Sequence, residues 1–271
     1  MGVVIGMFMR DHHQIELSNL TLAYQDTGEG KAVVLLHGFC GSHAYFDKII
    51  PTLSEKNRVI VPDLPGHGDS TFPKGNYEME YMADTLKELL DGLNLDKVTL
   101  FGHSLGGYIT LAFAEKYEER LHGYSLIHSS AFPDTEEAKE GRDSAIDKVE
   151  SEGVSALIEG LVPKLFSPDN VGSHARDVEK VKNIGCETTK EGAIGMLKAM
   201  KNRPDRNHVL KSSNLPALLI AGEKDQVIPP EKTFSVHKDT ISQALIKGAG
   251  HMSMMEKPEI LISEIQHFLK S

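Results

Sequence analysis

Cysteine is scarce in this sequence: only Cys40 and Cys186 occur among 271 residues. The two are far apart and lack the short spacing of zinc ligands, which argues against a disulfide framework and against a zinc site. Low cysteine usage is typical of proteins in a reducing compartment. We therefore expect a cytoplasmic protein without a structural metal.

Positive charge is also limited, with 29 Lys and Arg against 39 Asp and Glu and a net charge of -10. No basic block is longer than an isolated pair. Because nucleic-acid affinity depends on clustered Lys and Arg, we expect no nucleic-acid partner. The acidic balance also disfavours anionic membranes, although its main expected effect is solubility.

Long hydrophobic runs are missing as well. The apolar run from Gly2 to Met9 is too short to span a bilayer, follows no basic residue and lacks a small-residue cleavage site. Gly6 stands where a myristoylation motif needs Ser or Thr. We expect this run to be an N-terminal arm, and we expect no membrane partner.

Short aliphatic runs alternate with segments of helical periodicity along most of the chain. This alternation predicts parallel strands joined by crossover helices, preceded by an antiparallel pair over residues 14–26. The expected fold class is α/β, with a mostly parallel central sheet flanked by helices. The expected strands cover residues 32–36, 58–61, 98–101, 124–127 and 217–221 and a run ending at 246, and the expected helices cover 45–55, 79–93, 108–117 and 259–269.

The alternation breaks after Ser130. Residues 136–202 are charged, helical in period and free of any convincing strand, which predicts a helical insertion. The length suits a single core with one such insertion. We expect an α/β core formed by residues 1–130 and 209–271, and a helical lid formed by residues 131–208 and inserted after the sixth strand.

The pentapeptide GHSLG at residues 102–106 has the pattern G-x-S-x-G and lies between a predicted strand and a predicted helix. Small neighbours let the backbone turn sharply, so the Ser104 hydroxyl would stand exposed at a helix N-terminus. Gly38 and Phe39 follow another predicted strand, where a loop can aim N–H groups into the site. We expect the backbone N–H groups of Phe39 and Leu105 to form an oxyanion hole, with His37 supporting the loop.

Two further residues complete a possible nucleophilic site. Asp225 follows the predicted strand at 217–222, where the carboxyl end of a strand places a side chain at the site. Glu223 is the competing acid, but it can remain solvated. His251 lies between the last strand-like run and the terminal helix, and its small neighbours leave the ring free to reach Ser104.

Ser104, Asp225 and His251 follow one another in the chain order of the α/β-hydrolase triad. With the turn DLPGHGDS at residues 63–70, they make the sequence resemble, over essentially its whole length, the α/β-hydrolase fold superfamily and its serine-nucleophile branch of esterases and lactonases. The resemblance implies that Ser104 is the nucleophile, His251 the general base and Asp225 the acid that orients it. It implies no metal and no organic cofactor.

The lid and the loops around the triad are expected to bind substrate, and their Leu and Met residues favour an adaptable hydrophobic pocket. For the lid residues, packing within the lid is an equally good interpretation. The candidate substrate-binding residues are Gly38, His103, Leu161, Met196, Met200 and Met252.

We therefore expect a carboxylesterase that cleaves an ester, lactone or thioester of a small to medium hydrophobic substrate through an acyl-enzyme. A carbon-carbon bond hydrolase and a cofactor-free haloperoxidase or perhydrolase remain alternatives, and a non-catalytic ligand receptor is a further one. The chain is expected to be a monomer or a homodimer.

Overall fold

The computed structural model describes residues 12–73, 75 and 78–270, so the expected arm at residues 2–9 lies outside the described part. The described strands form one eight-stranded sheet in the order β1-β2-β4-β3-β5-β6-β7-β8. The strands are β1 (His12–Glu16), β2 (Thr21–Thr27), β3 (Lys31–Leu36), β4 (Asn57–Pro62), β5 (Val98–His103), β6 (Leu121–Ile127), β7 (Ala217–Gly222) and β8 (Ile241–Ile246).

The sheet is antiparallel at one edge and parallel elsewhere. β1 pairs antiparallel with β2, and β2 with β4, whereas the pairs from β4 to β8 are all parallel. Val33, Val34 and Leu35 of β3 have no exposed surface, because helices cover both faces at the centre of the sheet. The fold class expected from the sequence is confirmed.

Helices connect the parallel strands. α3 begins directly after β5, and several of the other helices are only one turn long. One long helix expected at residues 45–55 is instead two short pieces, because Pro51 has no N–H to donate and fits only the first turn of a helix. The helices of this part are η1 (His43–Phe46), α1 (Ile50–Leu53), α2 (Met79–Gly92), α3 (Leu105–Lys116), η2 (Glu118–Arg120), α9 (Pro230–Thr233), α10 (Ser253–Glu256) and α11 (Pro258–Phe268).

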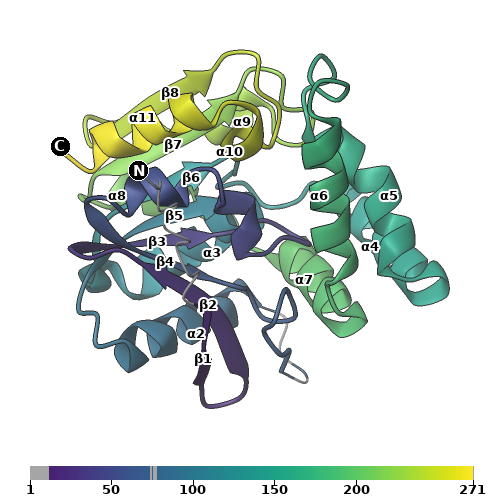
Figure 1. The fold of residues 1–271 in the computed structure, drawn as a ribbon, viewed down its shortest axis with the longest axis horizontal. Helices are drawn as coiled ribbons and strands as arrows, with labels where there is room; N and C mark the ends of the chain where they lie inside the picture. The colour runs from purple at the N-terminus through teal and green to yellow at the C-terminus, as the bar shows by residue number, and fades with distance from the viewer. Residues whose placement is uncertain (1–11, 74, 76–77, 271) are drawn as a thin grey trace, which may run out of the picture.

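The segment between β6 and β7 is helical. It contains α4 (Glu136–Glu152), α5 (Val154–Leu165), α6 (Ala175–Cys186), α7 (Lys190–Asn202) and α8 (Asn207–Ser212). Figure 1 shows α4 to α7 gathered at one side of the sheet, whereas α8 lies apart from them and packs against α3. The boundary expected at residue 208 therefore falls inside a helix that packs on the core.

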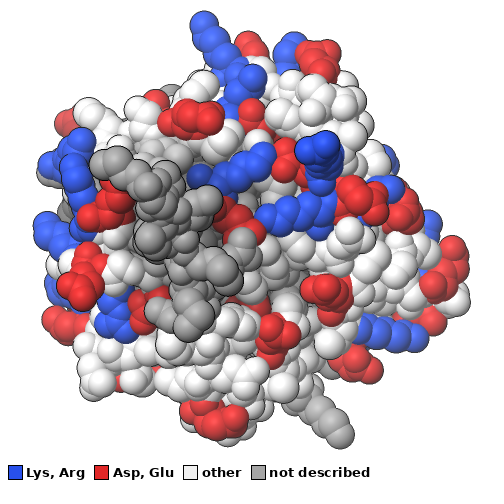
Figure 2. All heavy atoms as spheres, in the orientation of Figure 1, with Lys and Arg blue, Asp and Glu red and all other residues white. Residues whose placement is uncertain are grey.

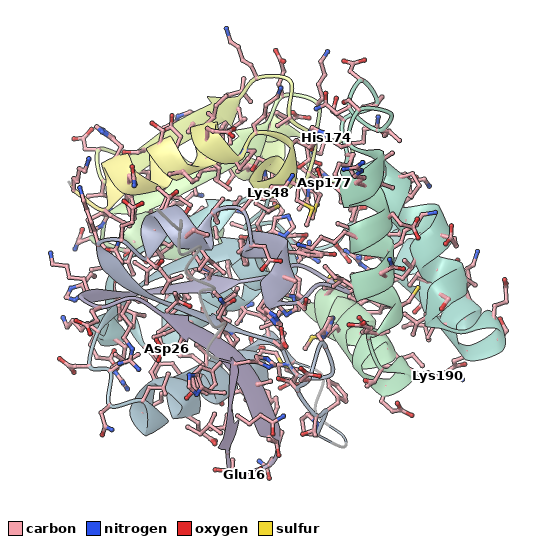
Figure 3. The ribbon with its side chains drawn as sticks, viewed as in Figure 1. Glu16, Asp26, Lys48, His174, Asp177 and Lys190 are labelled. Atoms are coloured by element: carbon pink, nitrogen blue, oxygen red, sulfur yellow. The ribbon has the colours of Figure 1, made fainter. Side chains whose placement is uncertain are left out.

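Ion pairs join this helical insertion to the segment that follows β3. Lys48 contacts Asp177 of α6 at 2.8 Å, as Figure 3 shows, and Lys180 of α6 contacts Asp47 at 2.7 Å. Each pair is partly solvated, so each contributes about 1 kcal/mol or less. Together they fix the position of α6 over the loop beyond β3.

The surface carries mixed charge. On the face shown in Figure 2, Lys and Arg side chains alternate with Asp and Glu side chains and do not form a separate basic patch. No helix in the described ranges is both long enough and apolar enough to cross a bilayer.

Candidate active site

Ser104 lies in a strained turn between β5 and α3. Its backbone has φ 52° and ψ -113°, a conformation that costs a non-glycine residue about 1–3 kcal/mol. The turn is possible because a side chain at Gly102 would collide with the Gly106 carbonyl oxygen, and one at Gly106 would collide with the Leu36 carbonyl oxygen. The G-x-S-x-G pattern thus provides close backbone packing, which leaves Ser104 at the N-terminus of α3.

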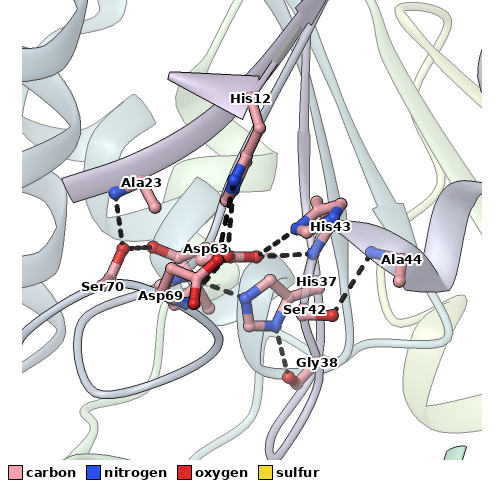
Figure 4. Close-up of polar contacts among 11 residues, drawn as sticks. His12, Ala23, His37, Gly38, Ser42, His43, Ala44, Asp63, Asp69 and Ser70 are labelled. Atoms are coloured by element: carbon pink, nitrogen blue, oxygen red, sulfur yellow. Dashed lines mark hydrogen bonds and ion pairs between the residues drawn. The ribbon is translucent and has the colours of Figure 1, made fainter. Parts of the chain in front are cut away.

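The loop after β3 is held in place by a polar network around Asp63, drawn in Figure 4. Asp63 is fully buried. Its Oδ1 accepts two hydrogen bonds from His43, one from the backbone N–H at 2.7 Å and one from the ring Nδ1 at 2.9 Å. Burial opposes ionisation of Asp63, but the bonds and charge of its histidine neighbours outweigh it and lower the pKa of the carboxyl. The carboxylate therefore ties η1 to the turn after β4.

His37 joins the same two segments. Its Nε2 accepts a hydrogen bond from the Leu64 N–H at 2.9 Å, so its Nδ1 carries the proton and donates to the Gly38 carbonyl at 2.8 Å. Complete burial lowers the pKa of His37 to about 4, which keeps the ring neutral. Both hydrogen bonds hold the loop that carries Phe39. Phe39 lines the cavity described below.

Asp225 and His251 form a short, buried contact. His251 Nδ1 lies 2.7 Å from Asp225 Oδ2, and Oδ1 of the same carboxylate accepts the backbone N–H groups of Val227 and Ile228 at 2.8 and 2.9 Å. Burial raises the pKa of Asp225, but the His251 charge and the hydrogen bonds from His128 and His251 lower it well below its ordinary value. An ionised Asp225 only accepts hydrogen bonds, so Nδ1 of His251 carries a proton and a neutral ring leaves Nε2 free to accept one.

His128 is a second histidine at the same carboxylate. Its Nδ1 lies 3.3 Å from Asp225 Oδ2, and its Nε2 lies 2.6 Å from Ser253 Oγ. A ring nitrogen this close to a carboxylate oxygen is more stable with a proton than with a lone pair, so Nδ1 is the N–H and Nε2 accepts from Ser253. Burial lowers the pKa of His128, which keeps it neutral.

The loop that carries His251 is anchored to the helical insertion. The backbone N–H of His251 donates to the Leu165 carbonyl at 2.7 Å, and His103 Nε2 donates to the His251 carbonyl at 2.9 Å. Glu256 accepts the Gly250 and Ser167 N–H groups, both at 2.9 Å. The insertion therefore takes part in positioning the expected base.

Ser104 and His251 both line one cavity of about 180 Å³ between the strand ends and the insertion. Among the described residues that line it are Gly38, Phe39, His103, Leu161 and Met200 from the sequence-based set. Leu105 is the first residue of α3, so its N–H is one of the four without an acceptor inside the helix.

The structure does not bring Met196 and Met252 to this cavity. Both are fully buried and absent from its described lining: Met196 belongs to the buried face of α7, and Met252 is the residue that precedes α10. Sequence reasoning also missed cationic lining residues, described below. No local motif marks them, since charged residues at helical spacing in an insertion usually face solvent.

Two groups of described residues bring potential metal ligands within 4.8 Å of one another: His12, His43 and Asp63 at the edge of the sheet, and His128, Asp225 and His251 in the site. In each group a carboxylate already contacts one or more imidazoles. The chemistry proposed below uses neither group to hold a metal.

Comparison with known proteins gives consistent results. The family model for the alpha/beta hydrolase fold matches residues 31–149. The structure of a thermophilic esterase from Thermogutta terrifontis (malate bound) is 33% identical, covers 95% of this chain and 98% of its own, and superposes with a TM-score of 0.91. The chain belongs to the alpha/beta hydrolase fold family.

Other members of the alpha/beta hydrolase fold family are more distant. Lipase 3 of Moraxella sp. is 27% identical over 93% of this chain and 84% of its own length. The enol-lactonase from Burkholderia xenovorans is 23% identical over 96% of this chain and 100% of its own, with a TM-score of 0.88, and shares the fold. The esterase and the lipase support an enzyme of the hydrolase type.

Proposed function

We propose that this protein is a serine hydrolase that cleaves the carboxylic ester bond of small to medium substrates, including lactones or thioesters. Ser104 is the nucleophile, His251 the general base and Asp225 the acid that orients His251. The observation that carries the proposal is the 2.7 Å contact between His251 Nδ1 and Asp225 Oδ2, at a cavity that Ser104 also lines. Esterases and lipases among the relatives support the same reaction class.

In the first half-reaction, His251 Nε2 accepts the proton of Ser104 as the oxygen attacks the ester carbonyl carbon. The backbone N–H groups of Phe39 and Leu105 stabilise the oxyanion of the tetrahedral intermediate. The intermediate collapses as the alcohol leaves with the proton from His251, and an acyl group remains on Ser104.

Water completes the cycle. His251 removes a proton from a water molecule, which attacks the acyl carbon, and Ser104 leaves with that proton as the acid is released. Asp225 stays ionised throughout, keeps the proton on His251 Nδ1 and stabilises the positive charge that the ring gains. Besides the substrate and this water molecule, these steps use side chains and backbone groups of this chain.

A panel of p-nitrophenyl esters with acyl chains from acetate to dodecanoate, run beside lactones and acyl thioesters, tests the function. We expect saturable hydrolysis of the shorter esters and a fall in kcat/KM when the acyl chain exceeds the cavity. A folded protein that hydrolyses no ester, lactone or thioester would contradict the proposal.

We propose that the α/β core comprises residues 1–130 and 209–271 and that residues 131–208 act as a lid over the cavity. A cytoplasmic location and a monomeric or homodimeric state are also proposed, and size-exclusion chromatography with light scattering measures the latter directly.

A further inference from the structure

The cavity of Ser104 is lined by an unequal number of positive and negative side chains. Among its described lining residues, Asp134 is the one carboxylate, whereas Arg142, Arg203 and Lys232 are cationic at neutral pH. Charges that are removed from water are normally paired with opposite charge. The lining residues thus carry an excess of two positive charges, and the ionised Asp225 behind His251 offsets one of them, so a net positive charge remains that an anion can balance.

Asp134 lies between the two guanidinium groups. Arg203 Nη1 donates to its Oδ1 at 2.6 Å, and Arg142 Nε donates to its Oδ2 at 3.1 Å. Only 5% of the Asp134 side chain and 7% of the Arg203 side chain are exposed, against 27% for Arg142. A single carboxylate thus neutralises one of two adjacent arginines, both of which line the cavity, and Arg142 is the more accessible of the two.

Arg203 is fixed in place from several sides. Its Nε donates to the Phe132 carbonyl at 3.2 Å, its Nη1 also donates to the Met200 carbonyl at 2.7 Å, and its guanidinium carbon lies 4.0 Å from the centre of the Tyr108 ring. Tyr108 and Ser104 both line the cavity. A positive charge is therefore held rigidly at the wall of the cavity that Ser104 also lines.

Arg142 can bind a ligand without losing its contact to Asp134. The contact uses the Nε of Arg142. Among the described residues, none accepts a hydrogen bond from the two Nη atoms of Arg142. The pair of Nη donors matches the two oxygens of a carboxylate. Lys232 of α9 lines the same cavity and has an exposed side chain.

We propose that the cavity contains a subsite for a carboxylate that the substrate carries in addition to its scissile ester. Arg142 and Lys232 bind this carboxylate, and the rigid Arg203 supplies a positive field. Leu161 and Met200 contact the apolar chain between the two groups. The inference rests on the proposed function for the reacting end of the substrate, but binding at the anionic end is measurable without turnover.

Calorimetric titration with adipate measures this subsite directly, with the neutral adipamide as the matched ligand. Arg142→Gln and Lys232→Gln remove one cation each, and Lys139→Gln is the control because Lys139 lies on α4 but pairs with the exposed Glu136 outside the cavity. We expect wild type and Lys139→Gln to bind adipate alike, and folded Arg142→Gln to bind it at least about tenfold more weakly. Equal binding by Arg142→Gln, or adipate binding no tighter than adipamide binding, overturns the subsite.

Turnover then connects the subsite to the reaction. We compare mono-p-nitrophenyl adipate with p-nitrophenyl hexanoate, which has the same chain length without the carboxylate. Wild type should prefer the adipate ester in kcat/KM, and Arg142→Gln should reduce this preference about tenfold through KM. If neither ester is hydrolysed, the proposed ester hydrolysis fails while calorimetry still decides the subsite. If wild type binds adipate but does not hydrolyse the adipate ester in preference to the hexanoate ester, the subsite does not bind the substrate of this reaction, and that part of the proposal is overturned.

Discussion

His128 Nδ1 lies 3.3 Å from Asp225 Oδ2, the same oxygen that His251 Nδ1 contacts at 2.7 Å. Both imidazoles are buried; the far side of the His128 ring is held by Ser253 Oγ, whereas the backbone N–H of His251 is held by the Leu165 carbonyl of the helical insertion. His128 therefore helps to fix the carboxylate that orients the proposed base. It acts through Asp225 and does not itself line the cavity among the described residues.

Replacing His128 tests this positioning role. His128 has φ 49°, a conformation that Asn tolerates, and the Asn amide can donate toward Asp225 in place of Nδ1. We expect His128→Asn to keep kcat within about threefold of wild type and His128→Ala to lower kcat about tenfold with little change in KM. Equal kcat for both variants would show that the donor at this position does not matter.

Asp225 and Glu223 are the two acids after β7, and they are distinguished by exchanging each for its amide. Asp225→Asn loses the carboxylate that keeps the proton on His251 Nδ1, so kcat should fall by roughly 10⁴-fold, the value known for serine proteases. Glu223 is exposed and accepts the Gly248 N–H at 2.9 Å, which Gln also can do. We expect Glu223→Gln to keep near wild-type kcat/KM; the reverse ranking would mean that the acid is misassigned.

Buried neutral histidines make stability depend on pH. Burial lowers the pKa of His67 to about 3, whereas an unfolded chain binds a proton near pH 6.5. Between these two pH values the unfolded state binds one more proton at His67 than the folded state does. The contribution of His67 to the free energy of unfolding is therefore fully present above pH 6.5 and falls by about 1.4 kcal/mol per pH unit as the pH decreases toward 3.

The variant His67→Asn isolates that contribution, because its amide N–H can replace the bond from His67 Nδ1 to the Pro65 carbonyl. Urea unfolding measured between pH 6 and 4 should give a slope of stability against pH that is smaller by about one proton than in wild type. An unchanged slope would show that His67 is protonated in the folded protein.

The central part of the sheet was predictable because its residues obey one local rule. The run from Val33 to Leu36 is apolar at every position, as a strand covered on both faces must be. β8 was foreseen only at its end near Ile246, because five of its six residues are partly or largely exposed on an edge strand and give no such pattern. Gly102 and Gly106 predicted the sharp turn at Ser104. The structure shows the steric reason, because a side chain at either glycine would collide with a backbone carbonyl oxygen.

The walls of the cavity could not be predicted in the same way. Arg142 and Arg203 lie 61 positions apart, and they meet only because α4 and α7 pack together against the loop after β6. Leu161 lines the cavity while Met196 is turned into the core, although both are apolar residues of insertion helices. Helix orientation decides such differences, and single-sequence periodicity does not determine it.

The central claim is that Ser104 is the nucleophile, and Cys40 offers the matched control. Cys40 lies beside the proposed oxyanion donor Phe39, but it is fully buried, and burial raises its pKa to about 12, so it stays a thiol at neutral pH. Cys40→Ala should therefore retain most activity, whereas Ser104→Ala should fold and lose esterase activity by several orders of magnitude.

Labelling with a fluorophosphonate, followed by intact-mass measurement and peptide mapping, tests this claim most directly. We predict one covalent adduct on wild type and on Cys40→Ala, located on the Ser104 side chain, with loss of esterase activity in proportion to labelling. We predict no adduct on folded Ser104→Ala. An adduct on any other residue, or p-nitrophenyl acetate hydrolysis by Ser104→Ala at a near wild-type rate, would contradict the account.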